Sequence, residues 1–132
     1  MILEKNISKG KKILICDDDK AVSDFLKRFL EKEGYSGVET AATGEEVLEK
    51  IQKNEYHLIF LDIKLPGIDG METLKRIKEF NKDIGVIMIT GFPEISLVEQ
   101  ATKLGAYDYI VKPFDLAYLK LVVLTKVLLD SK

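Results

Sequence analysis

Three consecutive carboxylates, Asp17 to Asp19, follow the short apolar run Ile13–Cys16. Like charges at this spacing repel one another, and near apolar surface their charge is costly unless something compensates it. Either the three side chains point into water, or some of them hold a cation. Two further residues that could take part in such chemistry, Asp62 and Lys112, also follow apolar runs directly.

The composition limits the class of protein. The 132 residues suffice for one domain with a core, and 46% hydrophobic with 32% charged residues is typical of a folded soluble chain. Twenty basic against 22 acidic residues, with no dense basic stripe, predict no direct nucleic-acid binding. The N-terminus MILEKNISKGKK has no apolar signal segment, and no stretch approaches membrane-spanning length. With a single cysteine, these features predict a cytoplasmic protein without membrane contact.

Short β-like runs alternate with longer helical patterns along the chain. Strands are expected over 13–16, 38–42, 58–61, 86–89 and 107–111, and helices over 21–33, from 43 to about 51, and over 71–80, 95–104 and 115–129. Such alternation implies right-handed β-α-β units and a doubly wound α/β fold, with helices on both faces of a parallel sheet. We expect one domain over 11–130, preceded by an N-terminal extension over 1–10.

The residues that end the expected strands point to a site. In an open α/β sheet, the ligand crevice lies at the carboxyl ends of the strands. The strand-ending residues here are the acids 17–19, Asp62, Thr90 and Lys112. If the first and third strands are neighbours, Asp62 meets the acidic cluster at one rim. Hard oxygen ligands that leave room in the coordination shell for water and a phosphoryl oxygen suit Mg²⁺ better than zinc. The chain also holds only one His and one Cys, the usual zinc ligands.

Four segments, in this order, carry a family resemblance: KKILICDDDKAV, IFLDIKLPGIDGMETL, VIMITGF and GAYDYIVKPFDL. Through them the chain resembles the receiver domain of bacterial two-component response regulators, from about Lys11 to the last helix. The last two segments are most similar to NtrC-like receivers, which belong to sigma-54-dependent activators. The resemblance implies a flavodoxin/CheY-like fold, with five parallel strands in the order 2-1-3-4-5 and five helices.

The resemblance also implies roles for the acidic residues. Asp62 is expected to be the phosphoacceptor, whose carboxylate attacks a phosphoryl group to give an aspartyl phosphate. Asp18 is expected to bind Mg²⁺ directly, together with Asp62 and the backbone carbonyl of Lys64, and Asp17 through an ordered water. Asp19 precedes the expected helix, so a role at the helix start is at least as well supported as one at the metal.

Further roles follow from the same resemblance. Lys112 is expected to contact a phosphoryl oxygen, with a cis bond to Pro113. Thr90 is expected to hydrogen-bond the phosphoryl group and Tyr109 to act as the paired aromatic switch. The alternatives are a β-branched strand terminus at Thr90 and an ordinary half-buried strand tyrosine at Tyr109. Bulky Phe92, two residues past Thr90, suggests slow self-hydrolysis of the acyl phosphate.

Two residues outside this set are expected to be structural. His57, at the start of the third strand, is interpreted as structural or solvent-facing. Cys16 is interpreted as a small buried hydrophobe.

The resemblance implies a phosphorylation switch and not a turnover enzyme. Its partner would be a sensor histidine kinase or a phosphotransfer protein. Phosphorylation is expected to move the fourth helix, fifth strand and fifth helix. The last helix, LAYLKLVVLTKVLL, is apolar on more than one face, which predicts a homodimer or output-domain contact. No output domain follows Lys132, so we expect a stand-alone receiver or a part of a longer regulator.

Two other classes of function stay open at this point. A haloacid-dehalogenase-type phosphatase would use Asp17 as nucleophile in a DxD pattern with Asp19, but its later paired acidic motif is missing. A binding module, flavodoxin-like or a receiver without phosphorylation, is the other class. Flavin binding is disfavoured because the first loop, CDDDKAV, is not a phosphate-cradling loop, and a degenerate receiver is disfavoured because the expected acidic, Thr and Lys positions are filled.

Overall fold

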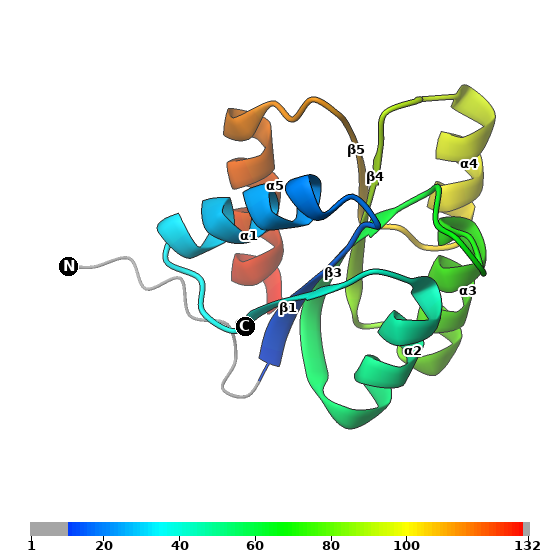
Figure 1. Cartoon of the computed structure of the whole chain (residues 1–132), viewed down its shortest axis with the longest axis horizontal. Helices are drawn as coiled ribbons and strands as arrows, with labels where there is room; N and C mark the ends of the chain where they lie inside the picture. Colours follow the sequence, from blue (N-terminus) through cyan, green and yellow to red (C-terminus); the bar gives the residue numbers. More distant parts are fainter. Residues whose placement is uncertain (1–10, 131–132) are drawn as a thin grey trace.

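A parallel sheet lies between two layers of helices in the computed structural model, which describes residues 11–130 (Figure 1). The strands are β1 (Lys11–Cys16), β2 (Val38–Ala41), β3 (Glu55–Asp62), β4 (Gly85–Thr90) and β5 (Asp108–Val111). The helices are α1 (Lys20–Lys32), α2 (Gly44–Lys53), α3 (Gly70–Phe80), α4 (Ile95–Lys103) and α5 (Leu116–Asp130). The strand order β2-β1-β3-β4-β5 confirms the predicted doubly wound fold. The expected extension over 1–10 lies outside the described residues.

Two hydrophobic cores form because successive strand residues point to opposite faces of the sheet. In β1, Ile13 and Ile15 join the core that α1 and α5 cover, whereas Leu14 and Cys16 join the core under α2, α3 and α4. All four side chains are fully buried. A strand buried on both faces must be apolar throughout, and this is why the strands read as continuous apolar runs in the sequence.

Four helices, α1, α2, α3 and α5, are preceded by a residue whose side chain caps the first turn; at α5 this is Asp115, which accepts a hydrogen bond from Tyr118 N–H at 3.2 Å. The carboxylate of Asp19 accepts a hydrogen bond from the backbone N–H of Ala21, which confirms the helix-start role expected for this acid. Thr43 caps α2 and Asp69 caps α3 in the same way. Each cap fixes where its helix leaves the loop that follows the carboxyl end of a strand.

The expected strand and helix boundaries hold to within three residues. The largest difference is at β3, which begins at Glu55 because the buried side chains of Tyr56 and His57 extend the strand. His57 is only 3% exposed, which agrees with the structural one of its two interpretations and not with the solvent-facing one. Cys16 is buried as expected, and burial, reinforced by the charge of Asp17, raises the pKa of its thiol to about 12. Among the described residues, no helix has the length and apolar character needed to cross a bilayer.

Candidate functional site

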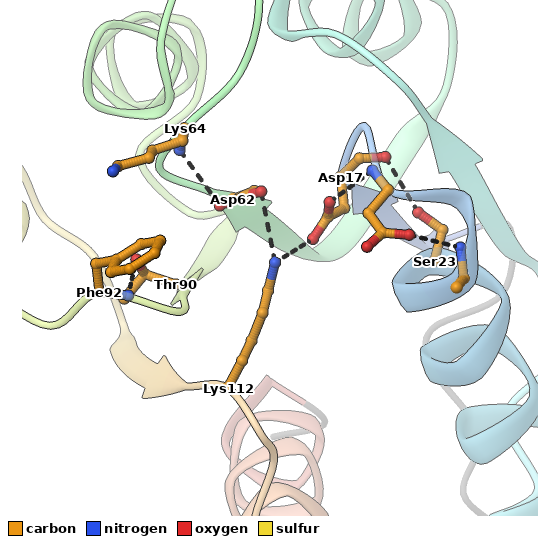
Figure 2. Close-up of polar contacts among 9 residues, drawn as sticks. Asp17, Ser23, Asp62, Lys64, Thr90, Phe92 and Lys112 are labelled. Atoms are coloured by element: carbon orange, nitrogen blue, oxygen red, sulfur yellow. Dashed lines mark hydrogen bonds and ion pairs between the residues drawn. The ribbon is translucent and has the colours of Figure 1, made fainter.

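Side chains from four strand ends converge at one rim of the sheet, as Figure 2 shows. Asp17 follows β1, Asp62 ends β3, Thr90 ends β4 and Lys112 follows β5. Carboxylate oxygens of Asp17, Asp18 and Asp62 lie within 4.8 Å of one another. The sequence-based prediction that Asp62 meets the acidic cluster is therefore confirmed.

Asp17 is the most enclosed of these acids, with its side chain wholly shielded from solvent. One of its oxygens, Oδ1, accepts a hydrogen bond from the backbone N–H of Asp19 at 2.8 Å. The other, Oδ2, lies 2.7 Å from the Lys112 ammonium (Figure 2). Both oxygens thus have partners, whereas the neighbouring Asp18 is exposed. The two adjacent acids are therefore not equivalent.

Lys112 contacts residues at the ends of three strands, β1, β3 and β4. Its ammonium lies 2.7 Å from Asp17 and 3.5 Å from Asp62 Oδ2, and its backbone N–H donates to the carbonyl of Thr90 at 2.7 Å. Burial alone would lower the pKa of this ammonium, but the hydrogen bond to Asp17 and the charge of Asp62 raise it overall. The bond to Pro113 is cis, as expected. Lys112 is the cation that compensates the acids in this arrangement.

The Asp62 carboxyl is nearly enclosed, with 10% of its side chain exposed. Burial raises its pKa to about 6, and the charge of Asp17 adds to the rise. Lys112 and the backbone N–H of Lys64, which donates to Asp62 Oδ1 at 3.2 Å, oppose it. The single ammonium of Lys112 therefore does not fully offset the acidic charge at this rim.

The donor set fits a hard divalent cation. Asp17, Asp18 and Asp62 offer carboxylate oxygens, the ligand type that Mg²⁺ prefers, and Asp18 lies open to solvent. The three acids could therefore hold a metal ion, and a bound cation would oppose the rise in the pKa of Asp62 that burial and the charge of Asp17 cause. Zinc fits less well, because the cluster contains no Cys or His.

The loop between β3 and α3, residues 63–69, lies beside the acids. The backbone N–H of Gly70 donates to the carbonyl of Ile63 at 2.8 Å, and a Cβ at Gly70 would collide with the carbonyl oxygen of Asp62. Glycine is therefore required where this loop turns back into α3. At the outer part of the loop, the carboxylate of Glu45 accepts a hydrogen bond from Ile68 N–H at 3.1 Å. No sequence pattern predicts this contact, because it depends on the path of the loop.

Thr90 and Phe92 border the site on the side of β4. Thr90 is buried, and its hydroxyl accepts a hydrogen bond from the backbone N–H of Phe92 at 3.1 Å (Figure 2). Phe92 itself is 65% exposed, and the Lys64 ammonium lies 4.3 Å from the centre of its ring. The cation–π contact links the loop after β3 to the loop after β4. It was not anticipated from the sequence, although both residues had been singled out.

Tyr109 lies on β5, which β4 separates from β3. Its side chain is half-buried against the core that α2, α3 and α4 cover. Its hydroxyl oxygen is enclosed, and burial raises the pKa of the phenol. This environment matches the half-buried strand tyrosine expected as the simpler alternative, and the role of Tyr109 as a switch stays a prediction.

Comparison with known proteins identifies a family. The family model of the response regulator receiver domain matches residues 13–124. Sporulation initiation phosphotransferase F of Bacillus subtilis is 39% identical over 81% of this chain and 86% of that protein. Nitrogen assimilation regulatory protein NtrX of Azorhizobium caulinodans is 41% identical over 90% of this chain, which spans only 26% of that protein. The receiver domain dimer of beryllofluoride-activated NtrC4 superposes with a TM-score of 0.82, at 34% identity, covering 88% of this chain and 95% of that one.

The family model covers β2 to β5 and all but the first two residues of β1, and it includes all four strand ends of the site. These matches confirm the receiver resemblance and the likeness to NtrC-like regulators that the motifs predicted. The chain belongs to the response regulator receiver domain family.

Proposed function

We propose that Asp62 accepts a phosphoryl group from a phosphohistidine of a sensor histidine kinase or phosphotransfer protein. The domain would then act as a regulatory switch and not as a turnover enzyme. The observation that carries the proposal is the setting of the Asp62 carboxylate. It ends the central strand β3, lies 3.5 Å from the Lys112 ammonium and groups with the carboxylates of Asp17 and Asp18. A nucleophile flanked by a fixed cation and by metal-binding acids suits phosphoryl transfer.

In the proposed reaction, a carboxylate oxygen of Asp62 attacks the phosphorus atom. A P–O bond forms while the P–N bond to the donor histidine breaks, and the leaving imidazole keeps the electron pair and takes a proton from solvent. Asp18, Asp62 and the backbone carbonyl of Lys64 would hold Mg²⁺, with Asp17 acting through a water. The metal would supply positive charge to the phosphoryl oxygens.

Residues at the neighbouring strand ends would stabilise the phosphorylated state. The Lys112 ammonium offsets charge on the phosphoryl group. The Thr90 hydroxyl accepts from Phe92 N–H and keeps its own proton, which it donates to a phosphoryl oxygen. Tyr109 turns further inward as Thr90 moves, and the added charge shifts an existing equilibrium between inactive and active conformations.

The output of this switch is proposed to lie on the α4–β5–α5 surface. The exposed large apolar side chains on these three elements are Ile95, Val111, Leu116, Tyr118, Leu121 and Leu128. α5 also buries Leu119, Val122, Val123 and Val127 on its opposite face. A helix with two apolar faces has one face left for a partner. Since the NtrC4 receiver is described as an activated dimer, we propose a phosphorylation-dependent homodimer or an output-domain contact here.

Sedimentation velocity with and without beryllofluoride and Mg²⁺ tests the dimer. We expect a concentration-dependent dimer with beryllofluoride, and its loss in Leu121→Glu. The matched control is Phe80→Glu, since Phe80 is also about half exposed but lies at the end of α3. A monomer under all conditions at high concentration would contradict the homodimer.

We assign residues 11–130 as the receiver domain and place it in the cytoplasm, without direct contact to nucleic acid or membrane. A single free cysteine fits a reducing compartment, and the formal net charge of −2 does not favour nucleic acid.

Phosphorylation by a small donor separates this function from a phosphatase that uses Asp17. The buried Asp17 side chain, with both oxygens occupied, is poorly placed to attack a substrate. After incubation with acetyl phosphate and Mg²⁺, we expect intact mass spectrometry to show one phosphoryl adduct. The adduct should disappear in Asp62→Asn and form more slowly in Asp17→Asn. An adduct that survives Asp62→Asn would overturn the assignment.

A further inference from the structure

We propose that Glu45, at the start of α2, is a positioning residue for the loop over 63–69 and thereby sets the affinity for Mg²⁺. The inference rests on the proposed function, in which the backbone carbonyl of Lys64 in this loop is a metal ligand. Glu45 itself lies outside the acidic cluster formed by Asp17, Asp18 and Asp62. It would act on the metal only through the loop.

The contact is made by the outer part of the loop. Glu45 Oε2 accepts a hydrogen bond from Ile68 N–H at 3.1 Å. The preceding residue, Gly67, has φ +74, and a Cβ there would lie 2.5 Å from the same carboxylate oxygen. The carboxylate therefore lies directly against the backbone of the loop. The left-handed conformation favours glycine at 67, and a Cβ there would displace the Glu45 carboxylate from the loop.

The inner part of the loop is fixed at the metal-binding acids. Gly70 N–H donates to the carbonyl of Ile63, which closes the loop at its base. Between the base and the outer part, Lys64 donates its backbone N–H to Asp62 Oδ1 at 3.2 Å. The loop is thus a short closed segment held at both ends, so a displacement at Ile68 would change the path of the backbone at Lys64.

The support that carries Glu45 is itself rigid. A Cβ at Gly44, the residue before it, would collide with the Thr73 hydroxyl of α3, so the first turn of α2 packs directly on α3. Thr73 is fully buried, and its hydroxyl donates to the carbonyl of Asp69 at 2.7 Å. The Glu45 side chain therefore extends from a helix turn that is held in place by close packing on α3. Because its side chain is exposed and outside the core, a substitution there should leave the fold intact.

Three variants separate the hydrogen bond from the charge. Glu45→Ala removes both, Glu45→Gln keeps an acceptor oxygen without the charge, and Glu49→Ala removes an exposed carboxylate one turn further along α2. In the metal-free protein, the exchange rate and chemical shift of the Ile68 amide report the hydrogen bond directly. A Mg²⁺ titration followed by backbone amide resonances gives the dissociation constant. Thermal unfolding checks that each variant is folded.

We expect faster exchange of the Ile68 amide and a Mg²⁺ dissociation constant about threefold to tenfold higher in Glu45→Ala, the range for one lost hydrogen bond. Glu45→Gln and Glu49→Ala should stay within about twofold of the unmodified protein. Equal Mg²⁺ affinity in Glu45→Ala and Glu49→Ala would overturn the proposal. A loss in Glu45→Gln as large as in Glu45→Ala would also overturn it, since charge would then be the cause. If the unmodified protein binds no Mg²⁺ or forms no adduct on Asp62, the proposed function fails instead.

Discussion

The substitution Asp62→Asn should stabilise the metal-free protein at neutral pH. It keeps the shape of the side chain and removes a charge that burial and Asp17 disfavour. The pKa of Asp62 rises from 3.8 to about 6 in the folded state. A difference of roughly two units corresponds to about 3 kcal/mol, and relaxation around the carboxylate lowers this upper limit. We therefore expect a gain of about 1 to 3 kcal/mol in the free energy of unfolding, or about 3 to 9 °C in Tm.

The sign of the pH dependence follows from the direction of this shift. Below pH 3.8, Asp62 is protonated in both the folded and the unfolded protein, and it contributes no pH dependence. Between 3.8 and about 6, the folded state keeps a proton that the unfolded state has lost, so stability falls as pH rises. Above pH 6 the full penalty is present. The advantage of Asp62→Asn should thus be largest at pH 7 to 8 and shrink as the pH falls toward about 4.

Urea unfolding followed by circular dichroism, with a chelator present, measures this difference at pH 4.5 and pH 7.5. Glu49→Gln is the control, because it neutralises an exposed carboxylate and should change stability by less than about 0.5 kcal/mol. Adding Mg²⁺ should stabilise the unmodified protein more than Asp62→Asn, since only the former keeps this ligand. An Asp62→Asn variant that is less stable at pH 7.5 without metal, or whose advantage does not depend on pH, would refute the argument.

Three further substitutions probe single contacts. Phe92→Ala should speed decay of the phosphoryl adduct by about twofold or more, because it removes a cation–π contact worth ~0.5 kcal/mol at the mouth of the site; an unchanged decay rate by mass spectrometry would count against it. Asp19→Ala should lower the free energy of unfolding in urea by about 1 kcal/mol, with most of it restored in Asp19→Ser. Gly70→Ala should cost about 1 to 3 kcal/mol in the same assay, because its Cβ meets the carbonyl of Asp62. The control Gly91→Ala, whose Cβ meets nothing within 4 Å, should be nearly neutral, and an equally small loss in Gly70→Ala would contradict the role of the clash.

The fold could be predicted well because each strand and each helix can be identified from the hydrophobic pattern of its own stretch of sequence. Strands covered by helices on both faces must be apolar throughout, and helices that cover a sheet must be apolar on one side, so the two patterns differ clearly. The start of β3 was missed because Tyr56 and His57 interrupt the apolar run while being buried in the structure. Burial of such amphipathic side chains depends on neighbours that are distant in sequence.

The site was predictable to the extent that it follows from strand ends. Parallel strands bring their carboxyl ends to one rim, so the sequence pattern alone predicts that Asp17, Asp62 and Lys112 lie together, as they do. Two contacts were not predictable, because loop paths determine both. They are the hydrogen bond from Ile68 N–H to Glu45 and the cation–π contact of Lys64 with Phe92. Local sequence therefore identifies the reacting groups, whereas the contacts that position them require the three-dimensional structure.

Lys112 connects the proposed site of phosphorylation to the proposed output surface. Before phosphorylation its ammonium lies closest to Asp17, at 2.7 Å, and further from Asp62, at 3.5 Å. A phosphoryl group on Asp62 carries about −2 charge in place of the single carboxylate charge and offers three acceptor oxygens, so it competes with Asp17 for this ammonium. The backbone N–H of Lys112 is bonded to the carbonyl of Thr90, and Val111 ends the edge strand β5 directly before it. A shift of the Lys112 backbone toward the phosphoryl group would therefore displace the end of β5, the strand that lies at the centre of the α4–β5–α5 surface.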